Sequence, residues 1–501
     1  MASTHYRPVF HVSPPLGRLN DPNGLFLGDN GDLHVFYQHD PYFPHAAKRT
    51  GWGHVVIPLA GGQAGIPRHL PDALVPDRDY DSHGCYSGCA VRPAANQRPA
   101  ADQHHGSDQR PAANQHHGSD TPHEPIRLFY TGNHKSDTGR VATQNVVVVD
   151  DPDGPLGGTY TKAPTNPVIA DRAPGTTPHF RDPHVSADPQ TPGAWRMVLG
   201  AQLGQGEGGE GAGTGAIALY RSDDLDSWDF AGMLSFDTSQ ATPGDAPDLV
   251  PGGYMWECPN LVRLRDEATG QDQDVLVLCP QGLEEVEEMD PDHPDVMFTH
   301  YASSDQCGYL VGRLEGTTFH VTRGFSELDV GHEFYAPQLL GTGDGAALML
   351  GWMGLPGQDD KPTLAEGWVH MLTCVRRVTL RDGWLYQRPL VPEQCPRWRG
   401  QLGERDVDKQ LVDAAGAPVV RISYDAQAHA LSIARRGGGP GLDRGDGNSW
   451  DTRTVRVPRG DVEIIVDGAA VEVFAGDGAV SAALQAYPLI DIAEFNKKDE
   501  H

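Results

Sequence analysis

The chain is poor in cysteine and in basic residues, and it lacks long apolar runs. Seven cysteines in 501 residues, without the spacing of a zinc site or the density of a disulfide scaffold, predict reduced thiols and no bound metal. With 39 basic against 68 acidic residues, the formal net charge is −29, which argues against nucleic acid and anionic membranes as partners. No segment is apolar enough to span a bilayer, and the first residues do not resemble a secretory signal. We therefore expect a cytoplasmic protein.

Short, strand-like apolar segments dominate what is present. Five of them are bounded by turn residues and recur at intervals of roughly 70 to 90 residues, which suits the four-stranded blades of a β-propeller. These cores lie at residues 35–37, 128–130, 197–199, 275–278 and 348–350. The long first interval contains a low-complexity insert at about 92–124, whose polar, repetitive composition predicts a loop without fixed structure. Its paired histidines also allow adventitious metal binding, but a solvated loop is favoured.

Beyond residue 392 the sequence changes character. A polar, charged segment lies between residues 397 and 410, and short alternating strands separated by turns follow it. Such alternation is typical of a β-sandwich. We therefore predict an all-β protein: a five-bladed β-propeller over residues 1–392 and a C-terminal β-sandwich over residues 405–501.

Three acidic residues, Asp21, Asp182 and Glu257, occupy similar early positions in three of the five repeating units. Tyr335 has the corresponding position in the fifth unit. Because the first strand of each propeller blade lines the central channel, residues at these positions should converge at one axial funnel. Hydrolysis of a sugar bond uses one carboxylic acid to protonate the leaving oxygen and one carboxylate to attack the anomeric carbon.

Each acidic motif also has an ordinary structural interpretation. Asn20-Asp21-Pro22-Asn23-Gly24 contains two turn dipeptides, and Arg181-Asp182-Pro183 suits a turn with a local ion pair. Glu257 has an alternative as the partner of Arg263 or Arg265. Its apolar surroundings and the Asp21 carboxylate instead favour the protonated form, as a general acid requires.

The motifs and their order resemble the invertase-type β-fructofuranosidases, glycoside hydrolases that cleave sucrose and fructans on a five-bladed propeller. The resemblance is strong over roughly residues 5–390. Besides the acidic motifs it rests on Val35-Phe36-Tyr37-Gln38, Trp52-Gly53-His54, Tyr86-Ser87-Gly88, Leu128-Phe129-Tyr130-Thr131-Gly132, Leu219-Tyr220-Arg221-Ser222, Phe334-Tyr335-Ala336-Pro337-Gln338 and Gly351-Trp352-Met353. Family members usually carry an aromatic residue two positions before the asparagine of the first motif, where this chain has Arg18.

The resemblance implies that Asp21 is the nucleophile, Glu257 the acid/base and Asp182 the group that stabilises the transition state by binding fructose hydroxyls. It also implies a set of substrate-binding residues: Asn20, Gln38, Trp52, Tyr86, Ser87, Arg181 and Tyr335. Arg181 is expected to fix the charge of Asp182. Trp52 offers an aromatic face to a sugar, although a tryptophan in a β protein is more often part of the core.

These features predict a retaining hydrolase, without cofactor, that releases fructose from sucrose and short fructo-oligosaccharides through a covalent fructosyl-enzyme. The partner is a small sugar. Three alternatives stay open: a fructosyltransferase that uses the same acids, a sucrose-6-phosphate hydrolase, and a non-catalytic fructan-binding propeller. The last predicts loss of at least one acid, and all three are present.

Overall fold

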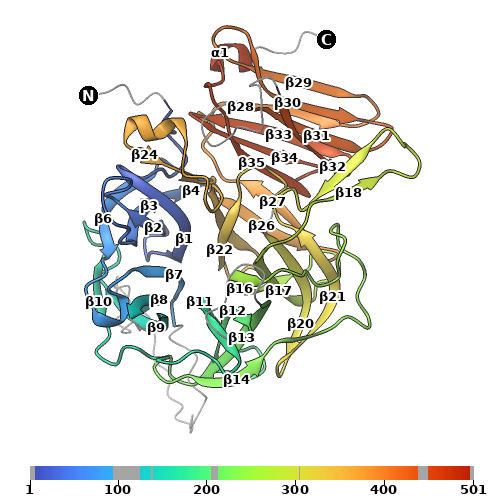
Figure 1. Cartoon of the computed structure of the whole chain (residues 1–501). Helices are drawn as coiled ribbons and strands as arrows, with labels where there is room; N and C mark the ends of the chain where they lie inside the picture. The colour runs from blue at the N-terminus through green and yellow to red at the C-terminus, as the bar shows by residue number, and fades with distance from the viewer. Residues whose placement is uncertain are drawn as a thin grey trace, which may run out of the picture.

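Strands account for nearly all the regular structure in this computed structural model, which describes residues 6–93, 125–136, 139–204, 213–303, 305–437 and 449–496. Five sheets of four or five strands form the larger unit, and two four-stranded sheets form the smaller one. Figure 1 shows the smaller unit, in orange and red, against one side of the larger. The predicted five-bladed propeller followed by a sandwich is confirmed. Most of the insert predicted at 92–124 lies outside the described residues.

The blades follow the chain in order. Blade 1 has β1 (Gly17–Leu27), β2 (Leu33–Asp40), β3 (Gly51–Ile57) and β6 (Arg68–Leu74), and blade 2 has β7 (Cys85–Val91), β8 (Ile126–Ser136), β9 (Gly139–Asp150) and β10 (Thr159–Lys162). Blade 3 has β11 (Thr176–Ala187), β12 (Trp195–Leu203), β13 (Thr214–Ser222) and β14 (Asp229–Met233). Blade 4 has β16 (Met255–Arg265), β17 (Asp272–Gln281), β20 (Gly308–Glu315) and β21 (Thr318–Glu327), and blade 5 has β22 (Tyr335–Gly341), β23 (Ala347–Met353), β26 (Arg376–Arg381) and β27 (Trp384–Pro389).

Short elements complete these sheets. β24 (Trp368–Val369) pairs in parallel with β1 and so ties the late part of the propeller to its first blade, while β15 (Ser235–Asp237) pairs with β21 and β25 (Met371–Leu372) with β23. Two ribbons are inserted within blades: β4 (Leu59–Ala60) with β5 (Gln63–Ala64) between β3 and β6, and β18 (Val286–Met289) with β19 (Met297–His300) between β17 and β20. The 3-10 turn η1 (Asp79–Asp81) connects blades 1 and 2, and η2 (Pro362–Glu366) lies between β23 and β24. No helix in the described part of the chain has the length and apolarity needed to cross a membrane.

All five predicted apolar cores fall in the second strand of a blade: β2, β8, β12, β17 and β23. The first strands, β1, β7, β11, β16 and β22, pack against one another around the axis in a closed ring. The acidic motifs lie on these first strands. The acidic residues therefore converge on the propeller axis because they occupy equivalent positions in the repeated blade, as predicted.

The sandwich consists of the sheet β28 (Arg397–Leu402), β33 (Gly460–Asp467), β34 (Ala470–Ala475) and β35 (Val480–Gln485) against the sheet β29 (Val407–Val412), β30 (Pro418–Asp425), β31 (Ala430–Arg436) and β32 (Trp450–Arg456), with α1 (Ile492–Phe495) at its end. The polar segment 397–410, beyond which the sandwich strands were expected to begin, itself forms β28 and most of β29. β28 is an edge strand whose arginines pair with Glu463, and charged edge strands are common because charge deters further strand pairing. We therefore propose that the domain boundary lies between residues 389 and 397.

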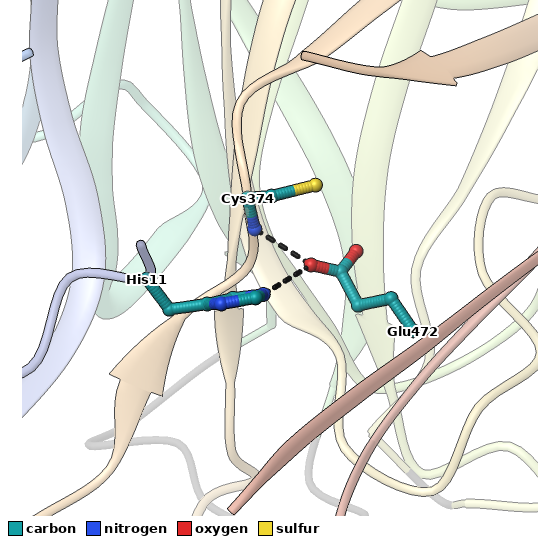
Figure 2. Close-up of side chains that lie close together, drawn as sticks. All are labelled: His11, Cys374 and Glu472. Carbon is teal, nitrogen blue, oxygen red and sulfur yellow. Dashed lines mark hydrogen bonds and ion pairs between the residues drawn. The ribbon is translucent and has the colours of Figure 1, made fainter. Parts of the chain in front are cut away.

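Buried charges join the propeller to the sandwich. Arg376 on β26 donates to Glu472 on β34 through Nε at 2.9 Å and to Asp329 through a terminal nitrogen at 2.8 Å. His11 bonds Asp467 through Nδ1 and Glu472 through Nε2, both at 2.8 Å. Figure 2 shows the His11 ring directed at the Glu472 carboxylate, which also accepts the Cys374 backbone N–H. These three residues are of metal-ligand type and lie close together, but His11 and Glu472 are already each other's hydrogen-bond partners.

Candidate active site

Every first strand of the propeller has a β-bulge at the level of the acidic motifs. The pairing register shifts between Leu19 and Pro22, Cys85 and Gly88, Arg181 and His184, Glu257 and Asn260, and Tyr335 and Gln338. A bulge turns a side chain away from the regular alternation of the strand. Asp182, Cys258 and Ala336 have positive φ values of 67°, 45° and 47°. The five bulges thus aim the site residues into the axial funnel.

Side chains just beyond the bulges hold neighbouring first strands in register. Asn23 accepts the Gly88 N–H at 3.1 Å, Cys89 sulfur accepts the Val185 N–H at 3.1 Å, His184 accepts the Leu261 N–H at 3.3 Å, and Asn260 accepts the Leu339 N–H at 2.9 Å. His184 accepts through Nδ1, and burial lowers its pKa to about 4, so the ring is neutral as this bond requires. The acids are therefore positioned by a chain of contacts from blade to blade.

Asp21 is held by polar groups from two neighbouring strands. Its Oδ2 accepts a hydrogen bond from Gln38 Nε2 at 3.0 Å and another from the Ser87 hydroxyl. Burial raises the pKa of the Asp21 carboxyl, the Ser87 bond opposes that effect, and the negative charge of Glu257 adds to it. Gln38 and Ser87 thus bind the Asp21 carboxylate, and their contact with sugar hydroxyls stays a prediction.

Asp182 faces Asp21 across the thiol of Cys258. The Cys258 sulfur lies 3.8 Å from Asp21 Oδ2 and 3.7 Å from Asp182 Oδ2. Asp182 Oδ2 also accepts the Cys258 N–H at 3.1 Å, while its own N–H donates to Thr131. Burial raises the Asp182 pKa to about 7, although Arg181 opposes the shift, and the charges of Glu257 and Asp21 raise it further.

Glu257 is bound on both oxygens. Oε1 accepts from Arg181 Nε at 2.9 Å and from a terminal Arg181 nitrogen at 2.5 Å, and Oε2 accepts the Tyr335 hydroxyl at 2.8 Å. Burial alone would raise the Glu257 pKa, but the Arg181 charge and hydrogen bonds outweigh it and lower the pKa. The expectation that Glu257 is the protonated acid here is therefore wrong: the pair of bonds from Arg181 favours its anion.

The partners differ from the sequence-based alternatives in two further ways. Arg263 and Arg265 pair with Asp272 and Asp274 on the neighbouring strand, so neither is the partner of Glu257. Arg181 was expected to serve Asp182, yet its Nε lies 3.9 Å from Asp182 and 2.9 Å from Glu257. Arg181 therefore links these two acids and belongs mainly to Glu257.

The other predicted binding residues separate into two groups. Tyr335 and Ser87 contact the acids, and Asn20 is half-buried beside Asp21 on β1. Trp52 is wrong as a sugar platform, because it is 0% exposed and packs between Phe36 and Tyr130. Its indole N–H donates to the Tyr86 carbonyl at 3.1 Å, so it supports the wall rather than forming it. The ring of Tyr86 is partly exposed.

Sequence reasoning missed several contributors. Cys258, Thr131 and Asn23 each touch an acid or its bulge. His179 Nδ1 lies 3.2 Å from a terminal nitrogen of Arg181, the residue that binds Glu257. A signal was available in four of the five first strands, all except β7: a proline one or two residues after the site residue, followed by Asn, His or Gln, marks the bulge and the contact beyond it.

The geometry suits chemistry on one neutral ring. The three carboxyls lie close enough for their charges to interact. Because they are buried and repel one another, the group keeps a proton to near neutral pH, and that proton belongs to the group rather than to one residue. Arg181 and the Tyr335 hydroxyl can donate hydrogen bonds to a ligand. Such an arrangement can provide a nucleophile, an acid and a group that stabilises developing positive charge.

Comparison with known proteins agrees with this chemistry. The profile described as "Glycosyl hydrolases family 32 N-terminal domain" matches residues 11–389. The chain is 33% identical over 500 residues to the sucrose-6-phosphate hydrolase of Klebsiella pneumoniae, with 95% of this chain and 88% of that protein covered. It is also 33% identical over 360 residues to the sucrose-6-phosphate hydrolase of Bacillus subtilis (strain 168), where the match covers 72% of this chain and only 59% of that protein.

Solved structures show the same fold over both domains. The structure of sucrose-6-phosphate hydrolase from Lactobacillus gasseri superposes with a TM-score of 0.70 at 26% identity, covering 97% of this chain and 89% of that one. The similarity thus extends through the sandwich as well as the propeller.

Proposed function

The chain belongs to glycosyl hydrolase family 32, and from this premise we propose that it is a retaining β-fructofuranosidase acting on sucrose, its phosphorylated form or short fructo-oligosaccharides. The observation that carries the proposal is the meeting of Asp21, Asp182 and Glu257 around Cys258 and Arg181. A family match alone leaves open whether the acids meet. In this structure Cys258 contacts Asp21 and Asp182, and Arg181 lies beside both Asp182 and Glu257, so the three acids belong to one site.

In the proposed first step, Asp21 attacks the anomeric carbon of the fructosyl unit while Glu257 protonates the departing oxygen. Gln38 and Ser87 hold the Asp21 carboxylate in line for attack. Asp182 binds fructose hydroxyls and stabilises the positive charge that develops on the ring. In the second step Glu257, now ionised, activates water, and the covalent bond to Asp21 is broken with net retention.

The proton must reach Glu257 for the first step. Arg181 keeps this carboxyl anionic, while Asp182 has a pKa of about 7 and Asp21 a raised pKa. Sugar hydroxyls that accept hydrogen bonds from Arg181 would weaken its pair with Glu257. Exclusion of water by the ring then favours the neutral acid. Binding of substrate thereby moves the proton of the group toward Glu257.

Two substitutions test these roles. Asp21→Ala should abolish release of fructose from sucrose, and Glu257→Gln should lower kcat by about 10²- to 10⁴-fold, the usual contribution of an acid/base. Asp32→Ala, in the exposed turn after β1, and Glu267→Gln, after β16, are the matched controls. Circular dichroism and thermal unfolding check that the variants fold. Full activity of folded Asp21→Ala would rule out its role as nucleophile.

Analysis of products separates the remaining alternatives. Proton NMR of the first product should show the β-anomer of fructose before mutarotation, as retention requires. Trisaccharide as the main product at high sucrose concentration would identify a fructosyltransferase instead. A binding propeller would release neither product.

A further inference from the structure

A cavity of about 960 Å³ lies between the propeller and the sandwich. On the propeller side, the loop between β19 and β20 contributes Tyr301 and Asp305, and the segment after β23 contributes Gln358. On the sandwich side, Arg435 comes from β31 and Arg453 from β32. None of the three acids of the candidate active site lines this cavity. A space of this size can hold a small metabolite.

Arg453 is a buried cation without a counter-charge. It is 8% exposed, and its one hydrogen bond within the described residues is donated to the Gly331 carbonyl. Its Nε is buried and has no partner there. No carboxylate of the described chain lies within ion-pair distance of Arg453, whereas Arg435 on the neighbouring strand pairs with Glu333 at 2.5 Å. Arginine is rarely buried unless it is paired. Arg453 therefore presents unused donors to the cavity.

His332, which precedes β22 and also lines the cavity, contributes a second unused atom. The residue is 1% exposed, and its Nε2 donates to the Asp451 carbonyl at 3.0 Å. Burial, together with the charges of Arg435 and Arg453, lowers the His332 pKa to about 3. The ring is therefore neutral and its Nδ1 is an acceptor. This Nδ1 is buried and has no partner among the residues that the structure describes.

Positive charge exceeds negative charge among the fully buried groups at this wall. Lys361 and Arg435 share the Glu333 carboxylate, with nitrogens at 3.1 and 2.5 Å from Oε1. Arg453 adds a third buried cation, in a chain whose net charge is −29. The acids that line the cavity are all at least partly exposed, so water screens their charges: Glu285, Asp305 and Asp451. The interior of the cavity therefore favours an anion.

We propose that this interdomain cavity binds a small oxyanion that also carries a hydroxyl, such as a hydroxycarboxylate or hydrogen phosphate. The planar guanidinium of Arg453 suits the oxyanion oxygens. His332 Nδ1 accepts a hydrogen bond from the hydroxyl. A single ligand thus satisfies two polar groups whose burial without partners is costly.

Such a ligand bridges the two domains. Arg453 belongs to the sandwich, and His332 belongs to the segment that leads into β22 of blade 5. A ligand that binds only when the two domains are docked stabilises the folded chain by mass action. Binding is measured without turnover, so the test stands whether or not the chain releases fructose.

Isothermal titration calorimetry of the full chain tests the proposal, with phosphate and citrate as probes at neutral pH and constant ionic strength. Each probe is compared with an anion that lacks the hydroxyl: sulfate for phosphate, and tricarballylate for citrate. At least one hydroxylated anion should bind saturably and about tenfold more tightly than its counterpart, as one hydrogen bond predicts. The same anion should raise Tm as its concentration increases.

Substitutions at the two unused groups should act differently. Arg453→Gln should weaken binding by about tenfold or more. Arg453→Lys retains a charge but not the planar fork, so it should weaken binding less, and it serves if the glutamine variant does not fold. His332→Ala should remove the preference for the hydroxylated anion. Arg405→Gln, at an exposed position in the turn after β28, is the matched control and should bind as wild type does.

Several results would overturn the proposal. One is failure of both phosphate and citrate to bind at about 10 mM. Another is binding that folded Arg453→Gln and Arg453→Lys leave unchanged. Equal stabilisation by phosphate and sulfate would be a general salt effect and would also reject the site. An anion that inhibits sucrose hydrolysis competitively would occupy the funnel and not this cavity. Binding by phosphate alone or by citrate alone supports the site and identifies which oxyanion it takes.

Discussion

The protonation of Glu257 depends on two hydrogen-bond donors. Arg181 and Tyr335 both stabilise its anion, one at each oxygen. A general acid must be protonated before the reaction starts. Because the two bonds lower the Glu257 pKa, activity should be lost at a lower pH, on the basic side of its pH profile, than burial alone would give. The tyrosine is the simpler of the two to test because its removal changes no formal charge.

We predict that Tyr335→Phe moves the basic limb of the kcat/KM profile to higher pH. Loss of the hydroxyl removes a bond to the charged form, so the Glu257 pKa rises and the acid stays protonated to higher pH. A bond of this kind corresponds to about one pH unit. The measurement is kcat/KM for sucrose between pH 4 and about 9, a window that brackets carboxyl titration. Tyr309→Phe is the control, since that hydroxyl accepts the Leu385 N–H; an unmoved or lowered limb would contradict the prediction.

For single residues, the sequence predicts which side chains form the site better than it predicts what surrounds them. Asp21, Asp182 and Glu257 are recognisable because acids in three motifs occupy equivalent places in a repeat. Trp52 is misassigned because a motif does not reveal which side of a strand faces a neighbouring blade. The pairing of Glu257 with Arg181 is also beyond reach, because the two residues lie on β16 and β11 and meet only when the ring closes.

The bulge in the first strand of each blade directs the repeated motifs into one site. Asn23 illustrates how the bulge is held: its Nδ2 donates to the Asp21 carbonyl and its Oδ1 accepts the Gly88 N–H, both at 3.1 Å. The side chain is fully buried. A single amide thus fixes the strand carrying the nucleophile against the strand carrying Ser87.

We predict that Asn23→Ala lowers the free energy of unfolding by about 1 to 3 kcal/mol, because it leaves the Gly88 N–H and the Asp21 carbonyl unsatisfied in the interior. It should also lower kcat more than it raises KM, since Asp21 loses its alignment. Urea unfolding and steady-state kinetics give the two quantities. Asn30→Ala, in the exposed turn between β1 and β2, should change neither. Unchanged kcat in a destabilised Asn23→Ala protein would restrict this residue to a structural role.

The elements themselves are largely predictable. Turn-bounded β-rich runs identify the second strand of each blade because that strand is buried on both faces. The strands at 397–402 and 407–412 are missed because their many polar and charged residues conceal the strand pattern, while the alternation that buries Leu402 and Leu411 is short. The bulges are not predicted, because the one residue that each adds to the first strand falls inside a site motif that has no apolar alternation to interrupt.

At the scale of the whole molecule, the propeller and sandwich are joined by charges that no domain could bury alone. Arg376 is fully buried between Glu472 and Asp329, and Asp467 and Glu472 hold His11 between them. Burial by itself would lower the His11 pKa, but the bonds and charges of these two carboxylates outweigh it and raise the pKa to about 9. The imidazolium is therefore part of the domain interface.

This charge makes interdomain stability depend on pH. A folded pKa of about 9 exceeds the unfolded value of 6.5, so the native state binds more protons in between and stability falls as pH rises through this window. The contribution of about 3 kcal/mol is complete below about pH 6.5 and is lost near pH 9. We predict that the stability difference between wild type and His11→Asn, measured by urea unfolding, is largest at pH 6 and shrinks toward pH 9. His45→Asn, at an exposed position, should show no such trend. A difference that stays constant with pH would mean that His11 is neutral and joins the domains only by packing.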